Sequence, residues 1–458
     1  MTLKLRDIAG RRVVVWGYGV EGRAAVRVLR AHAEPSSLTV VVEPGSIGFG
    51  MDDVPVLSGA DADQALARAE IVVKSPGVSP YTEHFRSRTT HAEVTGGTAL
   101  WFAETGGDRT IAVTGSKGKS TTASLVTHLL TALGEDVVLA GNVGRALLDV
   151  LNDDLRCGRP PERRFALELS SFQAAEVAHS PAVGVLTALF PEHLDWHGSV
   201  ERYYADKCNL FAHRADAVVA VNADNPNAEA RLGSIRGSVA YGVEGTIHVQ
   251  GSWVMDRDGR SLLDIAPTRL FGRHNAVNLA GALTALAAAG FDLHMRADDL
   301  QAALLDFRPL AHRLEPIGEI AGRLVIDDGL STAPQAAVAA LAAFDDRPVG
   351  IIVGGHDRGL EYEPLAAALA LRTTPTWVLG VPVSGERVIP QIAAAVRDAG
   401  NAAVHVEAFD DFDLAVEAAM RVVPEGGVIL LSPAAPSFGR FTNYADRSAH
   451  FRRLVGLA

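Results

Sequence analysis

The segment VTGSKGKSTT, residues 113–122, has the residue types of a phosphate-binding loop. It lies between an apolar run at 110–113, which predicts a strand, and a predicted helix at 122–133. A glycine-rich turn at such a junction gathers backbone N–H groups around an anion, and the helix dipole adds positive charge. Strict Walker spacing would need a glycine at Val113, so this loop is a shortened relative of that pattern. The alternative is a glycine-rich turn that binds no ligand. We predict instead that a nucleotide triphosphate is bound, by Gly115, Ser116, Lys117, Gly118, Lys119, Ser120 and Thr121.

Other polar residues accompany the next predicted strands. Asn142 follows a strand at 137–140, Glu168 lies in an apolar run from 164, and His193 follows a strand at 183–189. In an open parallel sheet the carboxyl ends of the strands share one edge, so Glu168 and His193 should lie near the loop. A carboxylate with the Ser120 hydroxyl is a normal magnesium shell. A surface acid and a structural turn histidine are the alternatives.

Three more side chains in this region could contact a nucleotide or its metal. Lys207, in a predicted helix, would by itself be a solvated lysine. Asn275 and Asn278 have the i, i+3 spacing that puts both amides on one helix face, and amides suit the edge of a purine. For Asn275, a helix N-cap is the alternative.

The N-terminal region predicts a second nucleotide site. An apolar run at 12–16 leads into Gly17-Tyr18-Gly19 and a G-x-G-x-x-G turn, a helix is predicted from about 21 to 31, and the run at 38–42 ends in Glu43. This order is typical of a Rossmann-like fold, in which such an acid binds a sugar or base. A further strand leads into Ser75-Pro76-Gly77, which could close over a diphosphate. NAD is the usual ligand of this motif, but nothing downstream resembles hydride transfer.

Length and composition restrict the partners. The 458 residues suffice for about three domains, and 48% hydrophobic with 21% charged residues is ordinary for a soluble protein. A net charge of -12 argues against nucleic acid as the main partner. Cys157 and Cys208 form no metal or disulfide pattern, and no segment predicts a signal peptide or a membrane span. We expect a cytoplasmic monomer.

Together these motifs resemble the Mur ligase family, the ATP-dependent amide ligases of peptidoglycan precursor synthesis. The resemblance runs from Arg12 to Phe451. It implies an α/β chain of three domains: a Rossmann-like UDP-binding domain at 1–105, a central P-loop-type ATP-binding domain with a mostly parallel sheet at 106–309, and a Rossmann-like amino-acid-binding domain at 310–458. Strands are predicted in the last domain at 324–327, 349–353, 376–379 and 428–431, and helices at 334–344, 388–399 and 412–422.

Within the family, the N-terminal turns resemble the ligases that add glutamate to UDP-N-acetylmuramoyl-L-alanine. The resemblance implies that UDP is bound there, with Glu43 near the uracil, and that Ser170 and the two turns contact this substrate. It implies two Mg²⁺ ions, held by Ser120 and Glu168 and by His193 and a carbamylated Lys207. Asn142 would lie near the phosphates, Asn275 and Asn278 near the adenine, Arg313 at a hinge, and Asp328 near the ribose or the incoming amine. Arg358, Ser437 and Tyr444 would line the glutamate site.

One loop departs from the pattern of the D-glutamate-adding ligases. They usually have a lysine where this chain has Leu330, so one cation is missing from the amino-acid pocket. Arg440 and Arg447 are further candidate cations, although each would ordinarily be a solvated arginine. The departures resemble the variant that adds L-glutamate and has an epimerase as its partner. The alternatives are D-glutamate and, from other classes, a nucleotide-dependent switch or an NAD-dependent dehydrogenase.

Overall fold

The computed structural model describes residues 2–45, 54–160 and 162–457. These residues form two compact units, Met1–Ala266 with Val277–Leu304, and Pro267–Ala276 with Leu305–Ala458. The first unit contains two parallel sheets and a small antiparallel one, and the second contains one large sheet. The predicted α/β class with mostly parallel sheets is therefore confirmed. No helix of the described residues has both the length and the apolar character needed to cross a bilayer.

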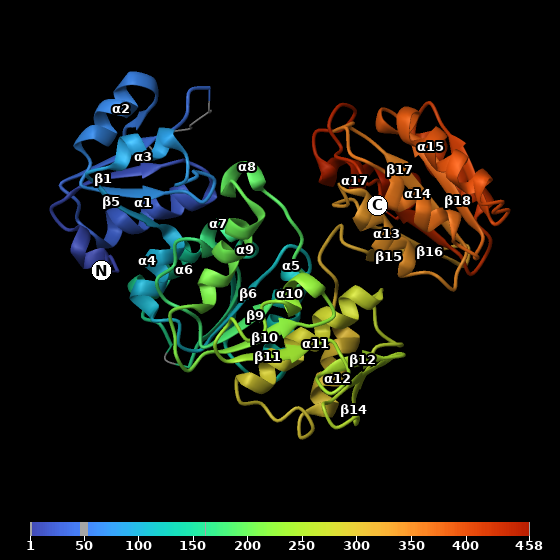
Figure 1. Cartoon of the computed structure of the whole chain (residues 1–458), viewed down its shortest axis with the longest axis horizontal. Helices are drawn as coiled ribbons and strands as arrows, with labels where there is room; N and C mark the ends of the chain where they lie inside the picture. The colour runs from blue at the N-terminus through green and yellow to red at the C-terminus, as the bar shows by residue number, and fades with distance from the viewer. Residues whose placement is uncertain (1, 46–53, 161, 458) are drawn as a thin grey trace. The chain divides into compact units, whose positions relative to one another are not determined.

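The first sheet has the strand order β3-β2-β1-β4-β5, and all its pairs are parallel (Figure 1). Its strands are β1 (Arg12–Trp16), β2 (Ser37–Val41), β3 (Val56–Leu57), β4 (Ile71–Lys74) and β5 (Glu93–Gly96). The accompanying helices are η1 (Leu5–Ile8), α1 (Val20–His32), α2 (Gly59–Arg68), α3 (Glu83–Thr89) and α4 (Gly97–Thr105). Strands β1 and β4 are almost entirely buried, as expected for a parallel sheet covered on both faces.

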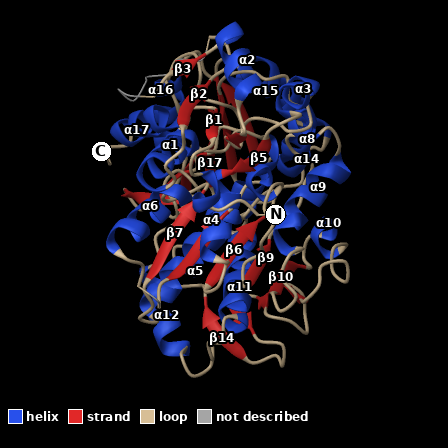
Figure 2. Cartoon of the chain, turned by 90° about the vertical axis from the view of Figure 1, so that its left-hand side faces the viewer, coloured by secondary structure: helices blue, strands red, loops and turns tan. Residues whose placement is uncertain are grey.

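The second sheet has the order β11-β10-β9-β6-β8-β7, again with parallel pairs. Its strands are β6 (Thr110–Thr114), β7 (Val137–Gly141), β8 (Arg164–Glu168), β9 (Val183–Leu186), β10 (Val218–Asn222) and β11 (Ser238–Tyr241). Figure 2 shows α5 lying across these strands. The helices are α5 (Lys119–Ala132), α6 (Leu147–Cys157), α7 (Ser171–Ala174), α8 (Leu194–His197), α9 (Val200–Cys208), η2 (Asn209–Phe211), α10 (Pro226–Glu229), α11 (Arg273–Ala288) and α12 (Ala297–Asp306).

A small antiparallel sheet, which the sequence did not predict, follows in the chain. Its strands are β12 (His248–Gln250), β13 (Trp253–Met255) and β14 (Ser261–Asp264). They are short and interrupted by charged turns, so they lack a clear periodic signal.

The first two sheets share one apolar core. Trp101 on α4 is fully buried, and its ring lies 5.0 Å from that of Phe165 on β8. Arg27 on α1 donates two hydrogen bonds, of 2.8 and 2.7 Å, to Asp149 on α6. The predicted boundary at 105/106 falls at the end of α4, inside this unit, so the division into three domains stays a prediction.

The large sheet of the second unit has the order β15-β16-β20-β17-β18-β19. Its strands are β15 (Glu315–Ile320), β16 (Arg323–Asp327), β17 (Val349–Gly354), β18 (Thr376–Val381), β19 (Val404–Ala408) and β20 (Val428–Leu431). Its helices are α13 (Pro334–Ala342), α14 (Glu363–Ala370), α15 (Ser384–Asp398), α16 (Phe412–Val422) and α17 (Tyr444–Leu454). The described residues of this unit form two apolar cores. Ile351 and Val353 pack into one core and Ile352 packs into the other, because successive side chains of a strand point to opposite faces of the sheet.

Candidate functional site

The phosphate-binding loop joins β6 to α5, as predicted, although α5 begins at Lys119 rather than near 122. The Ser116 backbone N–H donates to the Ala188 carbonyl at 2.7 Å, and the Ser116 hydroxyl lies 2.7 Å from the Tyr203 hydroxyl. Lys119 Nζ donates to the Ser116 carbonyl at 2.9 Å. The conformation of the loop is therefore fixed by buried contacts, including one from Tyr203, which the sequence did not indicate.

Gly115 cannot carry a side chain in this conformation. Its φ is 147°, and a Cβ would lie 1.9 Å from Thr187 Oγ1. We expect Gly115→Ala to weaken ATP binding at least about tenfold and to destabilise the fold by several kcal/mol, because overpacking adds to the backbone strain. Gly134→Ala is the control, since its φ is also positive, at 87°, but nothing lies within 4 Å of its Cβ. ATP titration and thermal unfolding of both variants measure the difference, and equal effects would contradict the steric argument.

Glu168 ends β8, where it is paired in register with Val113 of β6. Its side chain is only 1% exposed, and its Oε1 accepts a hydrogen bond of 2.8 Å from Asn142 Nδ2. Its Oε2 is buried without a hydrogen-bond partner among the described residues. A buried carboxylate oxygen without a donor is costly unless a cation completes its shell. The surface-acid interpretation is therefore wrong.

Lys207 lies on α9 and is 2% exposed, so the interpretation as a solvated helix lysine is also wrong. Its Nζ donates to the Gly115 carbonyl at 2.7 Å, which places it directly against the phosphate-binding loop. Burial lowers the pKa of Lys207 well below its ordinary value, and the charge of Lys119 lowers it further. The structure thus brings Lys207, Lys119 and the loop together and favours a neutral amine at this position.

His193 precedes α8 in the left-handed conformation, with φ 54°. Burial lowers its pKa, and the charge of Lys119 contributes in the same direction. A neutral imidazole near the loop is a possible metal ligand. Beside it, Lys117 forms an ion pair of 2.7 Å with Glu192. Ser120 is buried on the first turn of α5, followed by the half-buried Thr121.

The two asparagines lie on α11 with the predicted spacing. A Cβ on Gly118, where φ is 93°, would lie 2.3 Å from Asn278 Oδ1, so this amide contacts the loop closely. Asn275 belongs to the second unit, where its Nδ2 donates to the Phe271 carbonyl at 2.8 Å. Because Asn275 is the third residue of the helix, the N-cap interpretation is wrong.

The N-terminal turns meet at the carboxyl ends of β1 and β4. The Ser75 hydroxyl donates to the Gly17 carbonyl at 3.1 Å, and a Cβ on Gly17 would lie 2.8 Å from Ser75 Oγ. Tyr18 is buried, and Gly19 caps α1, whose N-terminus faces the turn. Pro76 and Gly77 follow Ser75 in a turn closed by the Val78 backbone N–H. The two predicted turns are therefore in contact.

Glu43 and Ser170 have different surroundings. Glu43 lies after β2 and is exposed, with an oxygen 3.3 Å from His84 Nε2. Ser170 caps α7 in a reciprocal capping box with Gln173. Gln173 Nε2 in turn donates to Glu21 on α1 at 2.8 Å, which links Ser170 to the first sheet.

In the second unit, the loops after β16, β17 and β20 lie at one end of the sheet. They carry Asp328 and Leu330, then Arg358, then Ser437. Ser437 is buried, whereas Arg358, Arg313 and Tyr444 are exposed, the last with its ring 5.5 Å from that of His312.

Arg447 is the unexpected residue here, because it is 2% exposed and not a solvated arginine. Its guanidinium donates to the carbonyls of Gly329 at 3.0 Å and of Ala435 at 3.1 Å. Burial lowers its pKa to about 10. It places a buried positive charge between the loops after β16 and β20, close to the position of Leu330.

Asp328 is the buried acid of these loops. Ser432 Oγ donates to it at 2.7 Å, yet burial raises its pKa to about 7. Since the unfolded carboxyl ionises near pH 4, the folded protein holds a proton that the unfolded chain has lost between pH 4 and 7. The free energy of unfolding of the wild type, relative to Asp328→Asn, should therefore fall by up to about 4 kcal/mol as the pH rises through this window.

Urea unfolding of both proteins at pH 4.5 and 8 measures this effect. Asp357→Asn is the control, because hydrogen bonds of 2.8 Å from Arg387 lower the pKa of Asp357, so that its carboxylate is ionised in the folded and the unfolded chain at both pH values. The difference in free energy of unfolding between the wild type and Asp357→Asn should therefore be the same at pH 4.5 and 8. If the difference in free energy of unfolding between the wild type and Asp328→Asn did not change with pH, the raised pKa of Asp328 would be contradicted.

Comparison with known proteins gives the family. The Mur ligase middle domain matches residues 113–286, and the Mur ligase glutamate ligase domain matches residues 312–435. The chain is 44% identical to the UDP-N-acetylmuramoyl-L-alanine–L-glutamate ligase of a Micromonospora species, covering 99% of this chain and 98% of that protein. It is 40% identical to the protein of the same name from Xanthomonas oryzae pv. oryzae, covering 99% and 97%.

Solved structures show the same fold at low identity. The MurF ligase from Thermotoga maritima in complex with ADP matches with a TM-score of 0.58 at 16% identity, covering 99% of this chain and 95% of that one. The UDP-N-acetylmuramate-alanine ligase MurC from the same organism matches with a TM-score of 0.55 at 18% identity, covering 97% and 98%. The chain therefore belongs to the Mur ligase family of ATP-dependent ligases.

Proposed function

We propose that this ligase joins glutamate to the free carboxylate of UDP-N-acetylmuramoyl-L-alanine in peptidoglycan precursor synthesis. The observation that carries the proposal is the 44% identity to a ligase named for this reaction over 99% of the chain. That match includes the first sheet and the second unit, where the acceptor and the amino acid would be bound. Similarity confined to the ATP-binding core would not support an assignment of the substrates.

The first sheet supports an acceptor with a diphosphate. Gly17 and Ser75 contact each other at the N-terminus of α1, whose dipole favours an anion. Tyr18, Gly19, Pro76 and Gly77 would contact the same diphosphate, and Glu43 the uracil. Among the described residues of this site, none is a recognisable catalytic group for hydride transfer. The NAD-dependent alternative therefore has no support from the site.

The proposed reaction has two steps. The acceptor carboxylate attacks the γ-phosphorus of ATP, releasing ADP and forming an acyl phosphate. The glutamate amine then attacks the acyl carbon, phosphate leaves, and the amine loses a proton. Lys119 and the loop N–H groups would offset the charge on the transferred phosphoryl group, while Asn142, Arg313 and Asp328 would orient the nucleotide and the amine.

We propose that the residues around the loop hold two magnesium ions. Glu168 Oε2 is buried without a hydrogen-bond donor among the described residues, and the Ser120 hydroxyl is on the adjacent helix turn. Burial lowers the pKa of Lys207, which favours the neutral amine that adds carbon dioxide, and the carbamate would join His193 as a ligand. Magnesium bound by these residues would neutralise phosphate charge. Asn275 and Asn278 would contact the adenine.

For the amino acid, we propose L-glutamate rather than D-glutamate. Leu330 removes the usual lysine, and Arg447 supplies a buried charge near it. Arg358, Ser437 and Tyr444 would complete the pocket. A downstream epimerase would then be the functional partner, and we propose that the enzyme acts as a cytoplasmic monomer.

The test is ATP-dependent product formation with UDP-N-acetylmuramoyl-L-alanine and each glutamate enantiomer offered separately. We expect product with L-glutamate, and phosphate release that requires both substrates. Activity with D-glutamate alone would overturn the stereochemical assignment. Phosphate release with neither substrate would instead support a nucleotide-dependent switch.

A further inference from the structure

A chain of hydrogen bonds, partly buried at Tyr81 and buried beyond it, connects the loop between β4 and α3 to the phosphate-binding region. The Tyr81 hydroxyl, between β4 and α3, donates to Asp206 Oδ1 on α9 at 2.7 Å. Asp206 Oδ2 lies 2.6 Å from His197 Nδ1, and His197 Nε2 lies 2.9 Å from Ser171 Oγ. Asp206 accepts both of its bonds, so His197 donates through Nδ1 and accepts at Nε2 from the Ser171 hydroxyl. The four groups therefore form one continuous chain with consistent donors and acceptors.

Three members of the chain adjoin residues of the proposed reaction. Asp206 directly precedes Lys207, whose Nζ donates to the Gly115 carbonyl. Ser171 begins α7, three residues after Glu168. Tyr81 follows the Ser75–Gly77 turn of the proposed acceptor site. A side chain of the loop between β4 and α3 thus holds the helix that carries Lys207.

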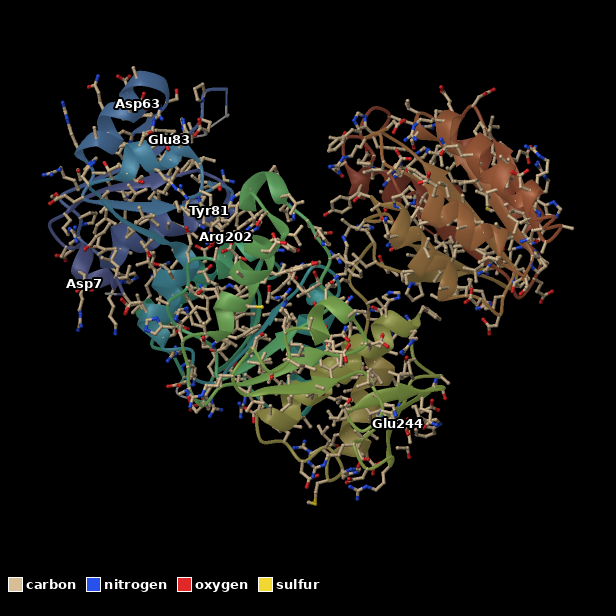
Figure 3. All side chains as sticks on the ribbon, viewed as in Figure 1. Asp7, Asp63, Tyr81, Glu83, Arg202 and Glu244 are labelled. Atoms are coloured by element: carbon tan, nitrogen blue, oxygen red, sulfur yellow. The ribbon has the colours of Figure 1, made fainter. Side chains whose placement is uncertain are left out.

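Neighbouring contacts fix Tyr81 in place. Figure 3 shows Tyr81 beside Arg202 of α9, and the Arg202 guanidinium lies 5.1 Å from the centre of the Tyr81 ring. The Ser79 hydroxyl donates to the Trp196 carbonyl at 2.7 Å, and Lys74 forms an ion pair of 2.8 Å with Glu176. The Tyr81 hydroxyl therefore reaches Asp206 from a segment that is anchored through the residues preceding it.

The Tyr81 hydroxyl offsets part of the cost of burying the Asp206 carboxylate. Asp206 and His197 are 6% and 3% exposed, and a buried carboxylate is tolerated only when its oxygens are hydrogen-bonded. Removing the Tyr81 hydroxyl deprives Asp206 Oδ1 of this donor. Because Asp206 lies on α9, losing this bond removes a tether between the β4–α3 loop and the helix that carries Lys207. Successive residues of a helix differ by about 100° in direction, so a small rotation changes the direction of Lys207 Nζ.

We propose that Tyr81 is a positioning residue for the phosphate-binding site, acting through Asp206, His197 and Ser171 to hold Lys207 against the loop. This inference rests on the proposed function. It assigns to a residue of the loop between β4 and α3 an effect on the chemical step rather than on acceptor binding.

Tyr81→Phe tests the proposal, because it removes one oxygen and keeps the ring under Arg202. We expect kcat for ligation to fall about tenfold, the lower end of the usual range for residues that orient metal ligands. The KM for UDP-N-acetylmuramoyl-L-alanine should stay within about twofold. Tyr204→Phe is the matched control, since Tyr204 lies on α9 itself but its ring packs beneath Arg231, and its kcat should not change.

A double-mutant cycle with Ser171→Ala adds a readout that a merely structural role would not move. If the chain acts as a unit, Tyr81→Phe with Ser171→Ala should lower kcat little more than the worse single variant. If the fold losses in kcat of the two single variants multiplied in the double variant, this result would overturn the proposal. So would an unchanged kcat in Tyr81→Phe, or a raised acceptor KM with normal kcat, which would make Tyr81 an acceptor-binding residue.

ATP titration separates this inference from the proposed function. A wild type that forms no product from the proposed substrates would reject the function, whereas ATP binding can still be compared between variants. Displacement of Lys207 should weaken ATP binding in Tyr81→Phe by about threefold, and not in Tyr204→Phe. Equal ATP affinities for the wild type and both variants would overturn the inference, provided that thermal unfolding shows all three to be folded.

Discussion

Lys207→Ala is expected to lower kcat for ATP-dependent ligation on the order of 10³-fold, and acetate or formate should restore part of it. The physical reason is that Lys207 is buried against the Gly115 carbonyl with a lowered pKa, so that it can carry a carbamate. Alanine leaves a cavity into which a small carboxylate fits. Phosphate release measured over a titration of added carboxylate gives both the loss and the rescue.

Lys119→Ala is the matched control for the rescue. It removes a lysine from the same loop, where Nζ donates to the Ser116 carbonyl, and should also lose most activity. Because a cation is missing in this variant, added carboxylate should not restore it. Rescue of both variants, or an unimpaired Lys207→Ala enzyme, would contradict the carbamate.

Glu168→Gln should lower kcat on the order of 10²-fold while leaving the free energy of unfolding without magnesium unchanged or higher. Activity and stability are expected to change in opposite directions because Glu168 Oε2 is buried with no hydrogen-bond donor among the described residues. Neutralising this carboxylate removes the unfavourable burial of a charge. The amide can keep the bond to Asn142 through its oxygen. Thermal unfolding with and without magnesium and nucleotide, alongside steady-state kinetics, measures both changes.

The opposite end of β8 offers the control. Glu135 accepts a hydrogen bond of 2.6 Å from Arg164, the first residue of that strand. Glu135→Gln should leave kcat unchanged and the magnesium-dependent stabilisation intact. If Glu168→Gln retained full activity, or remained as strongly stabilised by magnesium as the wild type, its role as a metal ligand would be wrong.

Most of the strands with continuous apolar runs could be predicted from the sequence. Strands β1 and β20 have the predicted bounds, and β17 and β18 extend beyond them by one and two residues. Strands β15 and β19 were missed, because they lie at the sheet edges and carry exposed polar residues. Helix α17, with a polar composition and a buried Arg447, was missed for a similar reason.

The sequence by itself determined the phosphate-binding loop, most of the strands with continuous apolar runs, and the residues that end those strands. These features depend on local spacing and periodicity, which a linear chain displays directly. Only the tertiary structure decided which ionisable groups are buried. Lys207 and Arg447 look like surface residues in their own helices, and their pKa values are lowered because distant segments exclude water from them. Tyr81 and Asp206 are separated by 125 positions, and no local pattern predicts a hydrogen bond across that distance.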